Sequence, residues 1–236
     1  MIEITVPILN EEETLEVQVT KIVDFINVEL KEYMPIKLVL ADNGSTDKTP
    51  EISKALQSKY EIVEYLKVPR KGVGLALKTS WKHSNADIVG YMDLDLATDL
   101  KYLKPTFEAL KNDRCDIVTG SRLAKGSKVI GRTLKREITS RAFNLILKVI
   151  FRNKFSDGMC GFKFLKKKFV DELVAKGAAS DGWFFATELL IVGEHSKLRI
   201  YDLPVVWTDD PNSKVKIVKL AMDYLKAMFE LKKKLN

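Results

Sequence analysis

Short apolar segments alternate with helix-like segments through the first 92 residues of the chain. Four of them have the length and apolar character of buried strands: Ile2–Val6, Ile36–Ala41, Ile62–Leu66 and Ile88–Met92. Apolar residues at helical spacing fill the intervals, over about 12–32, 49–59 and 75–84. Strands that alternate with helices build a parallel sheet through right-handed crossovers. The chain is therefore predicted to be an α/β protein with a mostly parallel sheet flanked by helices.

Polar clusters follow three of these strands, at residues 7–13, 42–47 and 93–99. The carboxyl ends of parallel strands meet at one edge of the sheet, where the ligands of such folds bind. Three loops that carry carboxylates at one edge exceed what packing requires. This edge is therefore the expected ligand site.

The second half continues the alternation with a more basic composition. Strands are expected over 116–119, 162–165 and 199–206, and helices over 134–151, 167–176, 183–194 and 214–235. No internal repeat and no linker interrupts the pattern. We therefore expect a single domain over residues 1–213, followed by a basic amphipathic helix over 214–236.

The net charge of +7 is unevenly distributed. Residues 121–168 carry a balance of +12 and residues 211–236 a balance of +5, which leaves −10 for the rest. A basic chain as a whole suggests nucleic acid or an anionic membrane as a partner. The segregation indicates instead that the acidic and basic regions face different ligands. No nucleic-acid-reading module accompanies the basic residues, so we expect no nucleic-acid partner.

The two cysteines are too few for a disulfide framework, which favours a reduced, cytoplasmic compartment. The chain turns acidic at once after Met1 and lacks the basic start of a signal peptide. No apolar run reaches the ~18–20 residues that cross a bilayer. We therefore expect a cytoplasmic protein that is soluble or peripheral to a membrane.

The strongest motif is Asp93-Leu94-Asp95, at the end of an apolar strand. Carboxylates at positions i and i+2 of an extended segment project to the same side. Such a pair can hold one hard divalent cation, Mg²⁺ or Mn²⁺, that is shared with substrate phosphates. A solvated acidic turn is the alternative, and the position after a buried strand favours the metal.

Two further segments are weaker signals by themselves. Asp42 follows a strand, where its carboxylate can accept from a base or a ribose; the alternative is a plain turn capped by Thr46 or Asp47. The segment Arg70-Lys71-Gly72-Val73-Gly74 precedes a helix, whose amino terminus favours anions. This segment matches neither a Walker motif nor a dinucleotide-binding fingerprint.

Seven segments in order give the chain a resemblance to a known family: PILNEEETL, LADNGSTD, RKGVGLAL, YMDLDLATD, GSR, SDGMCGFKFL and WFFATELL. Over about residues 2–215 the chain resembles the family 2 glycosyltransferases of the GT-A fold, especially the dolichyl-phosphate mannose and glucose synthases. The resemblance implies a GT-A (Rossmann-like) fold, with a nucleotide-sugar half over 1–120 and an acceptor half over 121–213.

The same resemblance implies roles for single residues. Nucleotide-sugar contacts fall to Pro7, Asn10, Glu11, Asp42, Lys71, Gly72, Asp93 and Lys214. Acceptor-phosphate contacts fall to Arg122, Arg136, Lys163 and Ser213. The metal ligands are Asp93 and Asp95, and catalytic roles fall to Asp95, Arg122 and Glu188.

The chain also departs from the family pattern. Leu9 stands where a base-stacking tyrosine is frequent, and Asn43 where a second aspartate is common. Ala97 replaces a glutamine that helps bind the metal in mannose synthases, and Ala186 replaces a frequent aspartate. UDP-glucose and GDP-mannose therefore both stay open as donors, and the Ala97-Thr98-Asp99 sequence after the D-x-D motif, together with the DGWFF segment, leans slightly to the glucose branch.

The implied reaction is the inverting transfer of a hexose from the nucleotide sugar to a polyprenyl phosphate. This acceptor is already anionic at neutral pH, so it needs positioning and no strong base. A glycan hydroxyl is the alternative acceptor, and it would require Glu188 or Asp157 as a base. A basic nucleic-acid-binding protein is the remaining alternative.

The helices over 141–151 and 214–235 combine apolar residues with basic ones. Helices of this kind can lie on an anionic leaflet. The alternatives are packing on the domain or against a second copy of the chain. We expect peripheral association with the cytoplasmic face of an anionic membrane.

Overall fold

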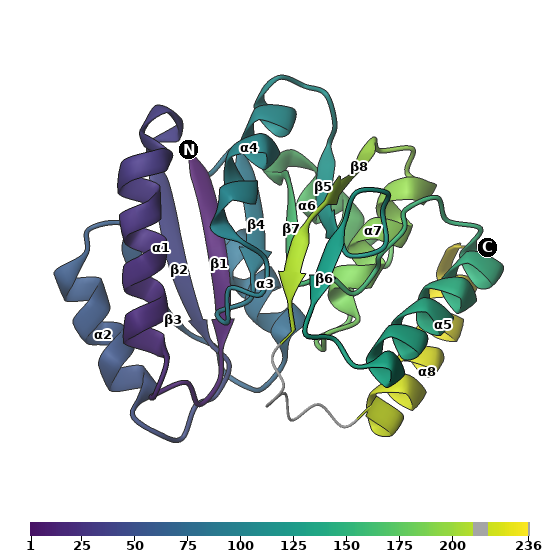
Figure 1. The fold of residues 1–236 in the computed structure, drawn as a ribbon, viewed down its shortest axis with the longest axis horizontal. Helices are drawn as coiled ribbons and strands as arrows, with labels where there is room; N and C mark the ends of the chain where they lie inside the picture. The colour runs from purple at the N-terminus through teal and green to yellow at the C-terminus, as the bar shows by residue number, and fades with distance from the viewer. Residues whose placement is uncertain (210–216, 236) are drawn as a thin grey trace.

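The computed structural model describes the backbone of residues 1–209 and 217–235, and the side chains of the last helix from residue 224 onward. Seven strands form one sheet in the order β3-β2-β1-β4-β7-β5-β8 (Figure 1). In chain order they are β1 (Ile2–Ile8), β2 (Ile36–Asp42), β3 (Val63–Lys67), β4 (Ile88–Met92), β5 (Ile117–Ser121), β7 (Phe162–Lys166) and β8 (Ile200–Pro204). All neighbours are parallel except β7, which runs antiparallel to both β4 and β5. The predicted mostly parallel sheet is confirmed.

Helices cover both faces of this sheet. One face carries α1 (Leu15–Glu29), α2 (Thr49–Lys59) and α4 (Leu103–Lys111). The other core contains side chains of α3 (Val73–Lys82), α5 (Leu134–Phe151), α6 (Val170–Ala175), α7 (Phe185–His195) and α8 (Ile217–Leu235). A small second sheet pairs β6 (Lys128–Ile130) with β9 (Val206–Thr208) in parallel.

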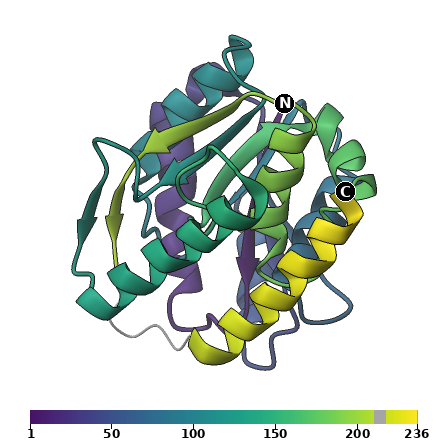
Figure 2. The same cartoon turned by 90° about the vertical axis from the view of Figure 1, so that its right-hand side faces the viewer.

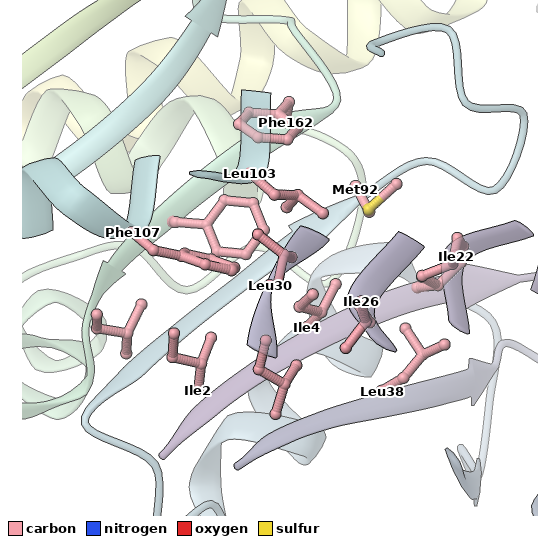
Figure 3. Close-up of a cluster of buried hydrophobic side chains, with 14 of the residues drawn as sticks. Ile2, Ile4, Ile22, Ile26, Leu30, Leu38, Met92, Leu103, Phe107 and Phe162 are labelled. Carbon is pink, nitrogen blue, oxygen red and sulfur yellow. The ribbon is translucent and has the colours of Figure 1, made fainter. Parts of the chain in front are cut away.

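The interior strand β1 shows why the sheet needs helices on both sides. Its apolar side chains on one face pack against α1 (Figure 3). Its other face carries Glu3 and Thr5, which are also buried. Ser80 Oγ donates to Glu3 Oε1 over 2.7 Å, and Trp81 Nε1 donates to Thr5 Oγ1 over 3.1 Å, both from α3. These hydrogen bonds satisfy polar groups that would otherwise destabilise a buried strand.

Most of the predicted elements lie where the sequence pattern placed them. The helices over 49–59 and 134–151 and the strand over 88–92 have the predicted bounds. The structure adds α4 and β6, which the sequence pattern did not predict, and it divides the single strand expected over 199–206 into β8 and β9.

The C-terminal helix α8 packs on the domain along one side. Tyr224, Met228 and Leu231 are buried, whereas Leu225 and Phe229 remain exposed. Packing on the domain, one of the alternatives for this helix, is therefore confirmed for its described side chains. Among the helices that the structure describes, none is both long and apolar enough to pass through a bilayer.

Candidate active site

The polar loops converge at one edge of the sheet. The strands β1, β2, β4 and β5 all end there, and the antiparallel β7 begins there (Figure 1). Asp42 ends β2, Asp93 follows β4 and Arg122 follows β5. The parallel sheet therefore brings acids of the first half and cations of the second half to the same edge.

The Asp93-Leu94-Asp95 motif does not keep the extended conformation that the sequence suggested, because Leu94 and Asp95 lie in a turn that Leu96 N closes on Asp93 O over 3.5 Å. Leu94 is buried in the core, whereas Asp93 is half-buried and Asp95 is exposed. Asp93 N donates to Gly161 O over 3.1 Å, and Asp95 Oδ1 accepts from Ala97 N over 3.0 Å. Burial raises the pKa of Asp93 to about 7, the Asp95 carboxylate adds to the rise, and nearby Lys163 and Arg122 oppose it.

This environment fits a divalent cation. Two adjacent carboxylates, one of them in a site that disfavours its charge, gain from a bound metal because the ion cancels their repulsion. Oxygen ligands suit Mg²⁺ and Mn²⁺. Within the described part of the chain, no set of three or more histidine, cysteine or acidic side chains is positioned to hold a metal. The remaining ligands would therefore come from water and from phosphate oxygens of the substrate.

Gly161 makes room for Asp93. A Cβ atom at Gly161 would lie 1.7 Å from Asp93 Oδ2, which is far inside van der Waals contact. We expect Gly161→Ala to displace this carboxylate and lower turnover at least about 100-fold, as a misplaced group typically does. Gly193→Ala is the control, because its new Cβ meets mainly the flexible end of Ile117. The test is to measure the steady-state rates of both variants across a Mn²⁺ titration. Equal activity of the two variants would contradict this expectation.

Arg122 is held by a buried carboxylate. Arg122 Nε and Nη2 donate to the two oxygens of Asp157 over 2.7 and 2.9 Å, and the Arg122 backbone N–H adds a bond of 3.1 Å. Asp157 is fully buried, and the guanidinium lies 5.0 Å from the ring centroid of Trp207. Although burial by itself would raise the pKa of Asp157, the Arg122 guanidinium holds it well below its usual range. Asp157 is therefore a fixed anion that orients Arg122.

Lys163 lies underneath the site instead of on its surface. Its side chain is 1% exposed, and Nζ donates to Cys160 O over 2.6 Å. Burial lowers the pKa of the ammonium group. The contact of Lys163 with an acceptor phosphate stays a prediction, and in the structure its ammonium group opposes the rise in the pKa of Asp93.

The first two polar loops are joined to each other. Asn10 Oδ1 accepts from Thr46 N over 2.8 Å, and Asn10 N donates to Ser45 Oγ over 3.0 Å. Asp42 is buried, and its carboxylate accepts from Ser45 N and from the Tyr65 hydroxyl, each over 2.8 Å. Two further residues predicted to contact the donor, Pro7 at the end of β1 and Glu11, whose N–H donates to Thr49 Oγ1, line the same junction.

Two amides at the amino terminus of α3 bind carbonyl groups of the protein. Gly74 N donates to Gly182 O over 3.2 Å, and Leu75 N donates to Asp181 O over 3.1 Å. These two amides are therefore already paired with carbonyls of a distant loop. Lys71 is exposed just before the helix, and Gly72 N donates to Asn43 Oδ1.

The remaining predicted residues lie farther along the chain. Glu188, in the first turn of α7, is 4% exposed, and its carboxylate faces Ser180. Arg136 Nη1, on α5, donates to Asp209 Oδ2 over 2.7 Å. Ser213 and Lys214 lie outside the residues that the structure describes.

Trp207 and Tyr65 were missed by the sequence reasoning. Trp207 lies over Arg122 and Tyr65 donates to Asp42, and both depend on strand neighbours that local pattern does not reveal.

The family model for glycosyl transferase family 2 matches residues 3–174, so the chain belongs to this family. Glycosyltransferase AglD of Haloferax volcanii is 30% identical over 223 residues, which cover 92% of this chain and 35% of AglD. Dolichyl-phosphate beta-glucosyltransferase ALG5D of Trichomonas vaginalis is 27% identical over 94% of this chain and 71% of that protein.

Solved structures share the fold. Glucosyl-3-phosphoglycerate synthase from Mycobacterium tuberculosis, crystallised with Mn²⁺, UDP-glucose and phosphoglyceric acid, superposes with a TM-score of 0.70 at 19% identity. The match covers 98% of this chain and 79% of that one. The chain thus spans most of the synthase but only about a third of AglD.

Proposed function

We propose that this chain transfers a hexose from a nucleotide sugar to a polyprenyl phosphate, with inversion at the anomeric carbon. The main support is that both carboxylates considered as bases for a hydroxyl acceptor already accept hydrogen bonds within the protein. Asp157 binds Arg122 through both oxygens, and Glu188 accepts from Ser180 through both oxygens. A phosphate acceptor needs no such base, so the observed arrangement favours it over a glycan hydroxyl.

Each charged group then has a task in this proposal. Asp93 and Asp95 would hold Mg²⁺ or Mn²⁺, which stabilises the nucleoside diphosphate as it leaves. Arg122, which Asp157 fixes, would orient the acceptor phosphate, and Arg136 is the second candidate for this contact. The dolichyl-phosphate beta-glucosyltransferase among the relatives supports a polyprenyl phosphate acceptor and glucose as the transferred hexose.

The test is a direct one with purified protein. Thermal unfolding is followed with UDP, GDP, UDP-glucose and GDP-mannose in the presence of Mn²⁺, because a ligand that binds the native state raises Tm. Labelled hexose transfer to dolichyl phosphate and to a phosphate-free polyprenol is then compared. Transfer to the phosphate alone supports the proposal, and transfer that requires a hydroxyl acceptor refutes it.

We also propose that α5 contacts the anionic cytoplasmic face of the membrane that carries the acceptor. This helix exposes Leu134 (76%), Ile138 (60%), Leu145 (62%) and Val149 (73%), whose spacing places them along one side. Exposed basic residues border this stripe: Lys135, Arg141, Lys148 and Arg152. The neighbouring α8, which lies beside α5 in Figure 2, adds exposed Phe229. Apolar residues rimmed by cations suit an anionic lipid surface.

Replacing Leu145 and Val149 by serine should therefore weaken binding to vesicles of anionic lipid by about tenfold or more, because each buried apolar side chain contributes about 1.5–3 kcal/mol. Val17→Ser with Val28→Ser is the matched control, since both valines are exposed on α1. Vesicle cosedimentation measures the effect. Equal loss in the two double variants would contradict a specific α5 contact.

A further inference from the structure

The loop between α6 and α7 docks directly on the start of α3. A Cβ atom at Gly72 would lie 2.5 Å from Asp181 O, and one at Gly74 would lie 2.3 Å from Ser180 O. Only glycine lets two backbones approach this closely. The hydrogen bonds from Gly74 N and Leu75 N to this loop then pin it in register with the helix.

Charge reinforces the same contact. Asp181 accepts from Lys78 Nζ over 2.9 Å and from Arg70 Nη2, so one carboxylate joins a cation before α3 to a cation within it. Lys78 Nζ also donates to Ala179 O. We call residues 179–182 the docking loop. It belongs to the second half of the chain, yet its partners surround the Arg70–Gly74 segment of the first half.

Glu188 binds the docking loop through Ser180. Glu188 Oε2 accepts from Ser180 N over 2.8 Å, and Oε1 accepts from Ser180 Oγ over 2.6 Å. Because Glu188 lies in the first turn of α7 and is almost fully buried, it anchors the loop to a rigid core helix. The described contacts leave this carboxylate facing the protein and not the Asp93 site.

We infer that Glu188 is a positioning residue, which fixes the Arg70–Gly74 segment for the nucleotide sugar through Ser180 and Asp181 and takes no proton in the reaction. This inference rests on the proposed function and replaces the base role considered for Glu188. This series of contacts reaches the loop after β2, since Gly72 N donates to Asn43, the residue after Asp42. Removing one of these contacts should weaken donor binding and change the chemical step little.

Three variants distinguish a positioning role of Glu188 from a role as a catalytic base. Glu188→Gln keeps a side-chain oxygen for Ser180 N, so kcat and the donor KM should stay within about threefold of the wild type. Glu188→Ala removes both acceptors and should raise the donor KM by about tenfold or more while kcat changes less, as expected for lost ground-state binding. Asp181→Asn, which leaves the Glu188 contacts intact but removes the charge, should raise the donor KM in the same direction.

Glu194 provides a matched control on the same helix. Its carboxylate also accepts backbone N–H groups, from Lys154 and Phe155, but these belong to the loop before β7 and not to the docking loop. Glu194→Ala should therefore lower thermal stability without raising the donor KM. Hydrogen exchange gives a readout without ligand, because Glu188→Ala should speed exchange at Gly74 and Leu75 and Glu194→Ala should not.

The outcomes are distinct. A loss of kcat of about 1,000-fold or more in Glu188→Gln, at unchanged donor KM, would establish a base and overturn the inference. Unaltered exchange at Gly74 and Leu75 in Glu188→Ala would overturn it as well, whatever the activity. If Glu188→Ala does not fold, Asp181→Asn with an unchanged donor KM decides against it. Failure of the wild type to bind any nucleoside diphosphate or sugar nucleotide would refute the proposed function itself, while faster exchange in Glu188→Ala would still demonstrate the loop contact.

Discussion

Exchanging Asp93 or Asp95 for asparagine should reduce sugar transfer by about 1,000-fold or more, because metal stabilisation of a leaving diphosphate is worth several kcal/mol. The amides keep the size of the side chains, so folding should survive. Asp93 lies in a site that disfavours its charge, and its neutral replacement removes that conflict. Initial rates with Mn²⁺ and calorimetric Mn²⁺ binding in the presence of UDP measure the two effects.

Asp99→Asn is the control for this experiment. Asp99 belongs to the same acidic segment, but it is exposed and pairs with Lys101 beyond the motif. Its replacement should leave the rate nearly unchanged. Full turnover by the double variant of Asp93 and Asp95 would refute a metal site at these residues. Equal losses in the single variants of Asp93, Asp95 and Asp99 would show that the negative charge of the whole segment matters instead.

Replacing Asp157 by alanine should lower the free energy of unfolding by about 3–5 kcal/mol, because it leaves Arg122 buried without its counter-ion. The Arg122 side chain is 7% exposed and the Asp157 side chain 0%, so water cannot replace the lost carboxylate without local opening. Met159 N also donates to Asp157 Oδ1 over 3.0 Å and loses its acceptor. Urea denaturation measures the change, and two-state behaviour is checked by two spectroscopic probes.

A second variant distinguishes charge from packing. Asp157→Leu combined with Arg122→Met removes both charges and keeps apolar volume, so it should be more stable than Asp157→Ala alone. It should nevertheless lack activity, since Arg122 is the proposed contact of the acceptor phosphate. A double variant no more stable than the single one would show that packing around Asp157, and not the unpaired guanidinium, dominates the loss.

The strands were predictable because burial on both faces leaves nearly continuous apolar runs, as in β2 and β4. Sequence pattern missed α4, where Pro105 interrupts the usual helical composition although the first turn of a helix tolerates proline. The direction of β7 also has no local signature. Phe162 and Phe164 are buried just as they would be in a parallel strand, and only the partners β4 and β5 reveal the antiparallel register.

The candidate site was likewise predictable from the sequence only in part. The sequence pattern placed Asp93 directly after β4 and Leu94 in the core, but it assumed an extended segment where the structure has a turn at Leu94 and Asp95. The glycines at 72 and 74 correctly indicated a close approach, but the sequence could not say what approaches. The structure places the backbone of residues 180–182 against both glycines. A contact between segments more than 100 residues apart leaves no trace in local composition.

The central place of β7 also sets the order in which the chain can complete its fold during synthesis. A ribosome releases β1 to β5 before β7 exists, and β7 lies between β4 and β5 in the sheet. Until residue 166 emerges, β4 lacks one of its partner strands and β5 lacks both, because its other partner β8 is synthesised later still. Such unpaired edges favour association with other chains. The sheet is therefore completed only when β7 joins β5 to β4 and β8 then pairs with β5. A nascent chain that pauses between residues 121 and 162 is the form most exposed to aggregation and most in need of a chaperone.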